Sequence, residues 1–349
     1  MLDRVHRLSD DSQLLKRLGV ALFQERFPWI GGDLQTLRDT IHPVTLPKEN
    51  GQRILIDVPT LPTGAAKDGK LLAFLDQPDQ APRGLVLLLH GLGGSSSREG
   101  LRRMGLRLQS AGFAVLRLNL RGADPGRKLA GGTYAARCDS DLIPVIARAR
   151  ELAGDRPLLG AGISLGGTML LNVCLSYPKS LDGLFCASSP LDLADCSASI
   201  ERPRNVIYQR WLLKRLIRQT LADPFGLSVQ EMRQLSGKNA VPRTIRAFDN
   251  IVTAPRWGFG DVETYYREAS PLNRLVADQY KMPPTLLLQA LDDPWVPAMA
   301  ALHLSDATSK TSPVGLQFTR RGGHNGFHSR GGCWGDQLAA AWLGHIVER

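Results

Sequence analysis

Residues 157–168 read PLLGAGISLGGT, and this stretch decides the fold. The apolar run at 157–159 is typical of a buried strand, and the segment TMLLNVCLSY that begins at Thr168 is typical of a helix. Between them lies Gly162-Ile163-Ser164-Leu165-Gly166, which matches the pattern Gly-x-Ser-x-Gly. In a nucleophile elbow of this kind, a strained turn between strand and helix exposes the serine hydroxyl above a sheet. The stretch therefore predicts a strand, a sharp turn and a helix, with Ser164 at the apex.

Glycine is expected at 162 and 166 because strand and helix nearly touch at such a turn, where a Cβ atom would clash. The pattern alone is a weak signal, since most turns rich in Gly and Ser carry no chemistry. The strand before it, the helix after it and two downstream partners strengthen it.

The composition describes a large folded chain. It has 349 residues, of which 43% are hydrophobic, so it can bury one large core or a core with an insertion. The five cysteines are scattered without CxxC or Cys/His spacing, which favours reduced thiols over a disulfide framework or a zinc site. The cysteines thus indicate a reducing compartment.

The N-terminal stretch MLDRVHRLSDDSQLLKRLGV is charged throughout and lacks the apolar segment of a secretory signal. No stretch approaches the roughly 20 apolar residues that cross a bilayer. We therefore expect a soluble, cytoplasmic protein without a transmembrane segment. Its oligomeric state cannot be read from the sequence.

The formal net charge of +10 would raise the affinity for phosphates, anionic lipids or nucleic acids in general. Lys and Arg are nevertheless spread along the chain, and no nucleic-acid-binding motif accompanies them. We interpret the charge as a solvated basic surface and expect no nucleic-acid partner. Peripheral contact with a membrane stays open.

Strand and helix patterns alternate from residue 84 onward. The segment GLVLLLHGL is continuously apolar, as a parallel strand covered on both faces is. Helical patterns then alternate with strand patterns. The predicted helices span 98–110, 140–152, 168–177, 298–304 and 337–347. The predicted strands span 114–120, 157–159, 183–187, 285–291 and 315–319. This predicts an α/β fold with a mostly parallel sheet flanked by helices, and function at the carboxyl ends of the strands.

The remaining segments complete the predicted domain organisation. Residues 1–50 form an N-terminal lead-in with a short helix at 11–23, and strands at 53–58 and 71–75 form an antiparallel edge. The core comprises 51–190 and 272–349. Because a structureless loop of that length is improbable in a compact domain, 191–271 is predicted to be an inserted, mainly helical cap.

One predicted helix of the cap spans 205–221. On a helical wheel its apolar residues Val206, Leu212, Leu213, Leu216 and Ile217 share one face, with Arg215 and Arg218 away from it. Basic residues outnumber acidic ones in the cap. They could attract anionic substrates or membrane surfaces, but a solvated helical face is an equally good interpretation.

A serine hydroxyl needs an adjacent base to act as a nucleophile at neutral pH, and that base needs an orienting acid. The strand at 285–291 delivers Asp292 and Asp293, and the next strand is followed by His324 in the turn RGGHNGF. The chain order Ser164, Asp, His324 is that of the α/β-hydrolase fold. Each residue lies just past a strand.

Adjacent residues that leave a strand point to opposite sides, so only one of the two aspartates should face His324. We select Asp293, because Asp293-Pro294-Trp295-Val296-Pro297 matches the arrangement Asp-x-x-Val-Pro found after that strand in many such hydrolases. Asp292 remains the alternative.

The oxyanion hole should use the backbone N–H of Leu165, which follows the nucleophile, and an N–H from His90-Gly91-Leu92-Gly93-Gly94. We select Leu92 for the second donor. The loop lacks the Gly-Lys-Ser/Thr ending of a phosphate-binding loop, so nucleotide binding is rejected. His90 is interpreted as a residue that shapes the turn.

No cofactor or metal is expected. His324 and His328 have a spacing that would suit a metal on a helix, but the glycines around them argue against a helix there.

The sequence resembles the α/β-hydrolase superfamily, in a bacterial hydrolase family related to yeast medium-chain fatty-acid ethyl ester synthase/esterases and to mammalian abhydrolase-domain lipases. The resemblance runs from about Phe27 to the C-terminus. It rests on the motifs Gly32-Asp33-Leu34-Gln35-Thr36, His90 to Gly94, Leu120-Arg121-Gly122, Gly162 to Gly167, Asp292-Asp293-Pro294 and Gly322 to Phe327. The resemblance implies Ser164, Asp293 and His324 as a catalytic triad and short- to medium-chain acyl esters as substrates.

The departures from the family lie outside the triad. Asp33 stands where the family often has His, and Tyr134-Ala135 stands where a Tyr-His pair is common. Neither touches the expected chemistry, but both leave substrate preference open.

The sequence thus predicts a serine carboxylesterase that acts on small-molecule acyl esters through an acyl-enzyme. The alternatives are an acyltransferase that makes esters from acyl donors and alcohols, a hydrolase resembling lipases or phospholipases, and a binding protein without activity on the same scaffold.

Overall fold

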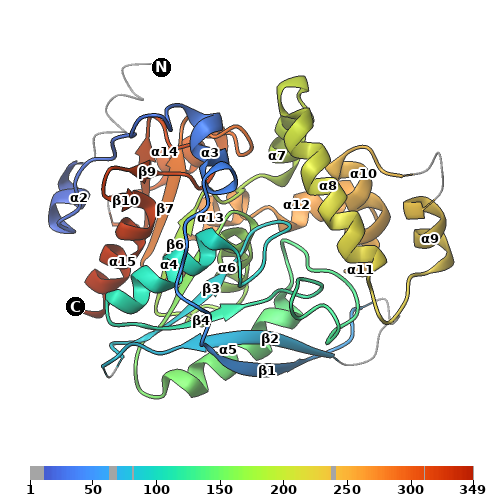
Figure 1. Ribbon diagram of the computed structural model, residues 1–349, viewed down its shortest axis with the longest axis horizontal. Helices are drawn as coiled ribbons and strands as arrows, with labels where there is room; N and C mark the ends of the chain where they lie inside the picture. Colours follow the sequence, from blue (N-terminus) through green and yellow to red (C-terminus); the bar gives the residue numbers. More distant parts are fainter. Residues whose placement is uncertain (1–11, 63–68, 81, 237–240, 310, 349) are drawn as a thin grey trace.

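The computed structural model describes residues 12–62, 69–80, 82–236, 241–309 and 311–348. Within them lies an eight-stranded sheet with the order β1-β2-β4-β3-β5-β6-β7-β8 (Figure 1). β2 pairs antiparallel with β1 and β4, and all other neighbours in this sheet are parallel. The strands are β1 Gln52–Val58, β2 Gly69–Asp76, β3 Leu85–Leu89, β4 Ala114–Leu118, β5 Leu158–Ile163, β6 Gly183–Ala187, β7 Thr285–Ala290 and β8 Val314–Thr319. The predicted fold class is confirmed.

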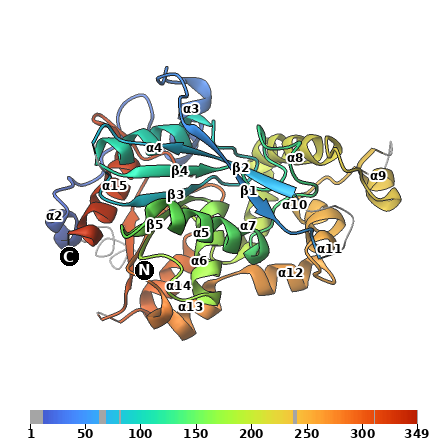
Figure 2. The same ribbon diagram turned by 90° about the horizontal axis from the view of Figure 1, so that it is seen from below.

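Helices cover both faces of the sheet, as Figure 2 shows. α4 Glu99–Ser110 and α15 Trp334–Val347 pack on one face, where Leu108 and Leu338 are fully buried. The other face carries α5 Asp139–Ala153, α6 Leu165–Ser176, α13 Leu272–Asp278 and α14 Met299–Ala307. The central strands β3 and β4 are buried at every position, which explains the continuously apolar sequence of β3.

The described part of the segment between β6 and β7 is helical, and Figure 1 shows much of it beyond the end of the sheet. Ile200, Leu212, Leu216 and Phe248 belong to its separate apolar cluster. The α-helices of 191–271 are α7 Leu193–Ile200, α8 Val206–Leu221, α9 Val229–Ser236, α10 Ile245–Phe248, α11 Ala254–Arg256 and α12 Val262–Ala269. We propose this segment as the cap.

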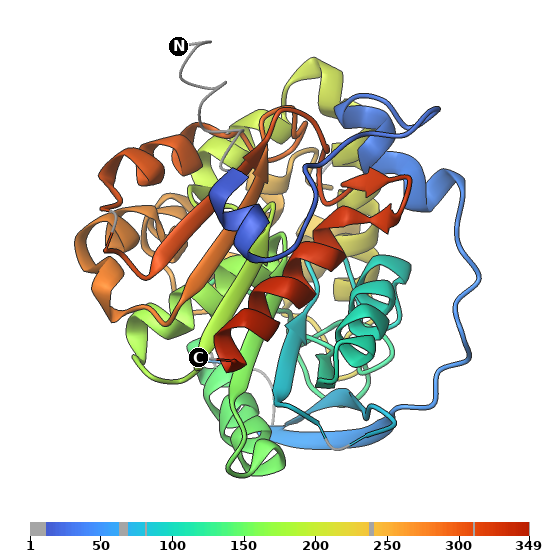
Figure 3. The ribbon, with the colours of Figure 1, turned by 90° about the vertical axis from the view of Figure 1, so that its left-hand side faces the viewer.

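The N-terminal region differs most from the prediction. α2 spans only Ser12–Arg17, and position 11 of the predicted helix lies outside the described residues. The helix stops early because Gly19 adopts φ 64° and Val20 N–H donates to the carbonyl of Leu15. A second helix, α3 Gly32–Ile41, was not predicted. Figure 3 shows the long segment that connects α3 to β1 along the outside of the molecule.

Two short strands, β9 His328–Ser329 and β10 Gly332–Cys333, pair antiparallel ahead of α15. All five cysteines are free. In the part of the chain that the structure describes, no helix combines the length and the apolar character that crossing a bilayer requires.

Candidate active site

Ser164 lies at the apex of the turn between β5 and α6, with φ 53° and ψ −127°. This conformation is rare for a residue other than glycine and is typical of strain at functional sites. A Cβ on Gly162 would lie 2.4 Å from Cα of Gly167, and one on Gly166 would lie 2.6 Å from the carbonyl oxygen of His90. Glycine is therefore required at both positions, as the sequence indicates.

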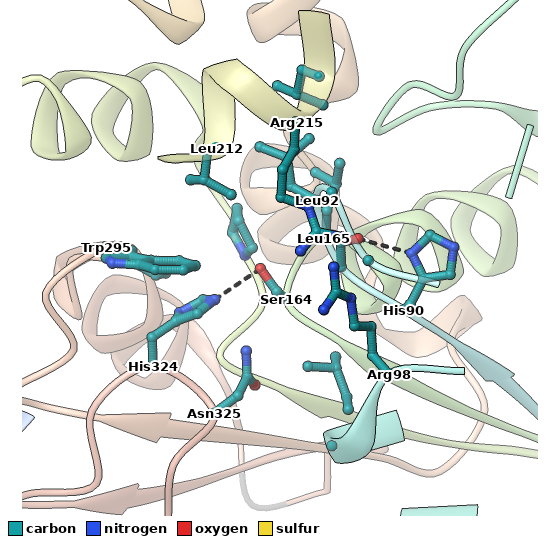
Figure 4. Close-up of a pocket in the computed structure, with 18 of the residues that line it drawn as sticks. His90, Leu92, Arg98, Ser164, Leu165, Leu212, Arg215, Trp295, His324 and Asn325 are labelled. Atoms are coloured by element: carbon teal, nitrogen blue, oxygen red, sulfur yellow. Dashed lines mark hydrogen bonds between the residues drawn. The ribbon is translucent and has the colours of Figure 1, made fainter. Parts of the chain in front are cut away.

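The structure brings Ser164 and His324 together. His324 lies in the loop after β8, and its Nε2 is 3.0 Å from Oγ of Ser164 (Figure 4). Its Nδ1 is 2.9 Å from Oδ2 of Asp293, which follows β7. His324 thus lies between a hydroxyl and a carboxylate, one at each ring nitrogen.

The two adjacent aspartates have separate partners. Oδ1 of Asp293 accepts hydrogen bonds from the backbone N–H groups of Trp295 and Val296, at 2.8 and 2.9 Å. This leaves Oδ2 for His324, and the Asp293 side chain is fully buried. Asp292 instead accepts a hydrogen bond of 2.9 Å from the N–H of Gly323. Of the two candidates, the structure thus places Asp293 against the histidine.

The loop after β3 packs directly against the nucleophile, since a Cβ on Gly91 would lie 2.8 Å from Cβ of Ser164. Within this loop, Gly93 N–H donates to the Tyr134 hydroxyl at 2.6 Å and Gly94 N–H donates to the Gly91 carbonyl at 3.0 Å. Among the described residues, no hydrogen-bond partner is found for the N–H of Leu92. Leu165 is the first residue of α6, so its N–H has no acceptor within the helix.

His90 fixes the shape of this loop. Its Nε2 accepts a hydrogen bond from Leu120 N–H at 3.2 Å, which assigns the hydrogen to Nδ1, 2.9 Å from the Gly91 carbonyl. Burial lowers the pKa of His90 to about 4, and the nearby charge of Arg215 adds to this shift. At neutral pH His90 is uncharged and holds the turn.

Helix α3 holds the loop that carries His324, which the sequence analysis missed. The N–H of His324 donates to Oγ1 of Thr36 at 2.8 Å, and the Thr36 hydroxyl donates to the carbonyl of Gly32 at 2.6 Å. Gln35 is fully buried, and its Oε1 accepts from the N–H of His328 at 2.7 Å. The family motif over 32–36 was the available signal, but its role is visible only in three dimensions.

Trp295 is the second residue that sequence reasoning missed. Its ring stacks on the imidazole of His324, with a centroid distance of 4.4 Å and an interplanar angle of 29°. Both rings border a pocket of about 850 Å³ that contains Ser164 and that Leu212 and Arg215 of α8 line from the cap side (Figure 4). This volume suits a small organic substrate.

His324 and His328, the pair considered for metal binding, contact different partners. Nε2 of His328 lies 3.1 Å from Oδ1 of Asp39, while His324 belongs to the pair with Ser164. Among the described residues, no group of three or more His, Cys, Asp and Glu side chains is arranged to hold a metal ion.

A serine elbow, a histidine and an aspartate at the ends of parallel strands define the α/β-hydrolase class of fold. The chain belongs to the alpha/beta hydrolase fold family, which residues 84–330 match. The family resemblance drawn from the sequence is confirmed.

Curated relatives agree with this assignment. The chain is 30% identical to mouse Phospholipase ABHD3 over 252 residues, which are 71% of this chain and 59% of the relative. It thus spans about three fifths of the length of that protein. It is also 30% identical to the protein named Putative esterase YheT of Escherichia coli K12, with 76% of each chain covered. A crystal structure of a Pyrococcus furiosus esterase has the same fold, with a TM-score of 0.53, 15% identity and coverage of 88% of this chain and 96% of that chain.

Proposed function

We propose that this protein is a serine carboxylesterase that hydrolyses short- to medium-chain acyl esters through an acyl-enzyme. The observation that carries the proposal is the pair of hydrogen bonds that links Ser164 to His324 at 3.0 Å and His324 to Asp293 at 2.9 Å, at the wall of a pocket. Nucleophile, base and orienting acid at hydrogen-bond distance are what acyl transfer to a serine requires.

In the proposed reaction, Ser164 attacks the ester carbonyl while His324 Nε2 takes the hydroxyl proton. Asp293 keeps the hydrogen of neutral His324 on Nδ1 and stabilises the imidazolium that forms. His324 then gives its proton to the leaving alcohol. Water deprotonated by His324 attacks the acyl-enzyme in the second half and releases the acid.

The developing oxyanion would be bound by the N–H groups of Leu165 and Leu92. The assignment of Leu92 is supported by the loop itself, because the N–H groups of Gly93 and Gly94 already donate to the Tyr134 hydroxyl and to the Gly91 carbonyl. Loss of one such donor typically lowers turnover by about 10²–10³-fold.

The named relatives support ester bonds as the target, since one is named a phospholipase and another an esterase. The partly apolar walls of the pocket, which include Leu92, Leu212 and Trp295, support an acyl chain as part of the substrate.

The test is hydrolysis of p-nitrophenyl esters of increasing acyl length by the wild type and by Ser164→Ala. We expect activity that peaks at short to medium chains and disappears in the variant. Equal hydrolysis by both folded proteins, or by neither, would refute the proposal and favour a binding scaffold. Product analysis in the presence of ethanol separates hydrolysis from acyl transfer, because transfer yields the ethyl ester.

A further inference from the structure

Three of the five arginines that line the pocket beside the proposed nucleophile form a cluster. Arg98 lies immediately before α4, whereas Arg215 and Arg218 lie on α8 of the cap. Figure 4 labels two of them and shows the Arg98 and Arg215 side chains extending into the pocket from opposite sides toward each other. The positive charges of core and cap therefore meet over the same cavity as Ser164.

Arg215 is held in this place by packing. Its Nε lies 3.6 Å from the position of a Cβ on Gly93, so the side chain rests on the loop beside Leu92. Its guanidinium carbon lies 4.8 Å from the ring centroid of Trp211, a cation–π contact. The helical wheel places Arg215 away from the apolar face of α8. In the structure, the side of α8 that carries Arg215 faces the pocket and not open solvent.

The cluster lacks neutralising partners. Among the described residues, no carboxylate forms an ion pair with Arg98, Arg215 or Arg218, and the buried Nε of Arg215 has no hydrogen-bond partner. Other buried arginines of the chain do have carboxylates, such as Arg121 with Asp141 at 2.6 Å. The guanidinium groups of Arg98, Arg215 and Arg218 are thus available to a ligand.

The arginines also repel one another. Burial lowers the pKa of Arg215 to about 10, and the charges of Arg98 and Arg218 add to this shift. Tyr134 and Asp124 oppose it. Arg215 remains charged at neutral pH. An anion placed between these groups would relieve the repulsion and satisfy their donors.

We propose that Arg98 and Arg215 bind an anionic group, phosphate or carboxylate, carried by the ester substrate, so that the enzyme prefers anionic acyl esters to neutral ones. This inference rests on the proposed esterase function. The guanidinium fork matches both anions, because each presents paired oxygens at the right spacing. The anion belongs to the substrate because Arg215 packs against the loop that contacts Ser164, which brings any bound anion close to the scissile bond.

The test compares esters that differ only in charge. One pair is 1-hexanoylglycerol and 1-hexanoylglycerol 3-phosphate, with the anion on the alcohol side. The other is p-nitrophenyl hexanoate and p-nitrophenyl hemiadipate, with the anion on the acyl side. The quantity measured is the ratio of kcat/KM for the anionic ester to that for the neutral ester, at low and high salt.

We expect wild type to prefer the anionic member of at least one pair, and Arg215→Gln or Arg98→Gln to lower that ratio by about tenfold, as the loss of one charged hydrogen bond does. High salt should lower the ratio as well. The matched control is Arg210→Gln, an exposed arginine of the same helix outside this pocket, which should leave the ratio unchanged. Equal ratios in wild type and the two pocket variants would overturn the inference.

Binding separates this inference from the proposed function. Calorimetric titration of Ser164→Ala with 1-hexanoylglycerol 3-phosphate should give tighter binding than with 1-hexanoylglycerol, and Arg215→Gln in that background should abolish the difference. This result would hold even if no ester were turned over. Inorganic phosphate that binds as tightly as the phosphorylated ester would instead assign the site to free phosphate and refute substrate recognition.

Discussion

Replacing Asp293 by Asn should nearly abolish turnover by forcing His324 into the wrong tautomer. Oδ1 of Asp293 accepts two backbone N–H groups, from Trp295 and Val296, so the oxygen of an asparagine must occupy that position. The amide NH₂ would then face Nδ1 of His324, which lies 2.9 Å from Oδ2 in the native protein. Nδ1 would have to accept a hydrogen bond, and the ring hydrogen would move to Nε2.

A histidine with its hydrogen on Nε2 cannot take the proton of Ser164, whose Oγ lies 3.0 Å away. In triads where the acid is exchanged in this way, kcat falls by about 10⁴-fold, which corresponds to roughly 5.5 kcal/mol of barrier. We expect a loss of this order in Asp293→Asn, with little change in KM.

The matched control is Asp292→Asn. Its carboxylate accepts from Gly323 N–H, a contact that an asparagine oxygen can keep, so kcat should stay within a few-fold of wild type. The assay is p-nitrophenyl butyrate hydrolysis at pH 7.5, with circular dichroism to establish folding. If folded Asp293→Asn keeps more than about a tenth of the wild-type kcat, or if Asp292→Asn loses more than Asp293→Asn, the tautomer argument fails.

Three further predictions concern the surroundings of the site. Thr36→Val removes the acceptor for His324 N–H, so kcat should fall and the free energy of unfolding should drop by about 1–3 kcal/mol. Thr36→Ser keeps the acceptor and should restore both. Unchanged kcat and an unchanged free energy of unfolding in chemical denaturation of Thr36→Val would contradict this prediction. Trp295→Leu removes the ring stacked on His324 and should lower kcat about threefold to fivefold with little effect on KM. An unchanged kcat would show that the stacking does not contribute to turnover. Burial raises the pKa of Asp249 from 3.8 to about 6, so the folded state binds its proton more tightly than the unfolded state. Stability should therefore decrease as pH rises from about 4 to about 6, and Asp249→Asn should remove up to about 3 kcal/mol of this decrease; urea titrations with parallel pH profiles for both proteins would contradict this.

The core of the fold could be predicted from the sequence because local sequence patterns and tertiary environment agree there. β3 is covered on both faces and therefore has a continuously apolar sequence. The Gly-x-Ser-x-Gly turn could be predicted for a related reason, because β5 and α6 approach so closely that only glycine fits at positions 162 and 166. The position of His324 followed from strand order, and the choice of Asp293 over Asp292 also needed the match to Asp-x-x-Val-Pro.

The features that were missed depend on contacts between distant segments. Helix α3 has few apolar residues and is stabilised by buried polar contacts, such as Gln35 to His328, that leave no periodic pattern in the sequence. Arg215 shows the same limit, because a helical wheel separates apolar from polar faces but does not reveal that the polar side covers a cavity. The stacking of Trp295 on His324 depends on how two loops fold over the strand ends.

The hydrogen bond between Thr36 and His324 has a consequence for the order of biosynthesis. α3 leaves the ribosome before any strand of the large sheet, whereas the loop that it holds follows β8. The elbow and the loop at Gly91 can form while the chain is still growing, but the histidine cannot be held until the loop after β8 has been translated. A nascent chain that ends before β8 therefore carries its serine without a base, and the proposed esterase activity should arise only when the loop after β8 meets α3.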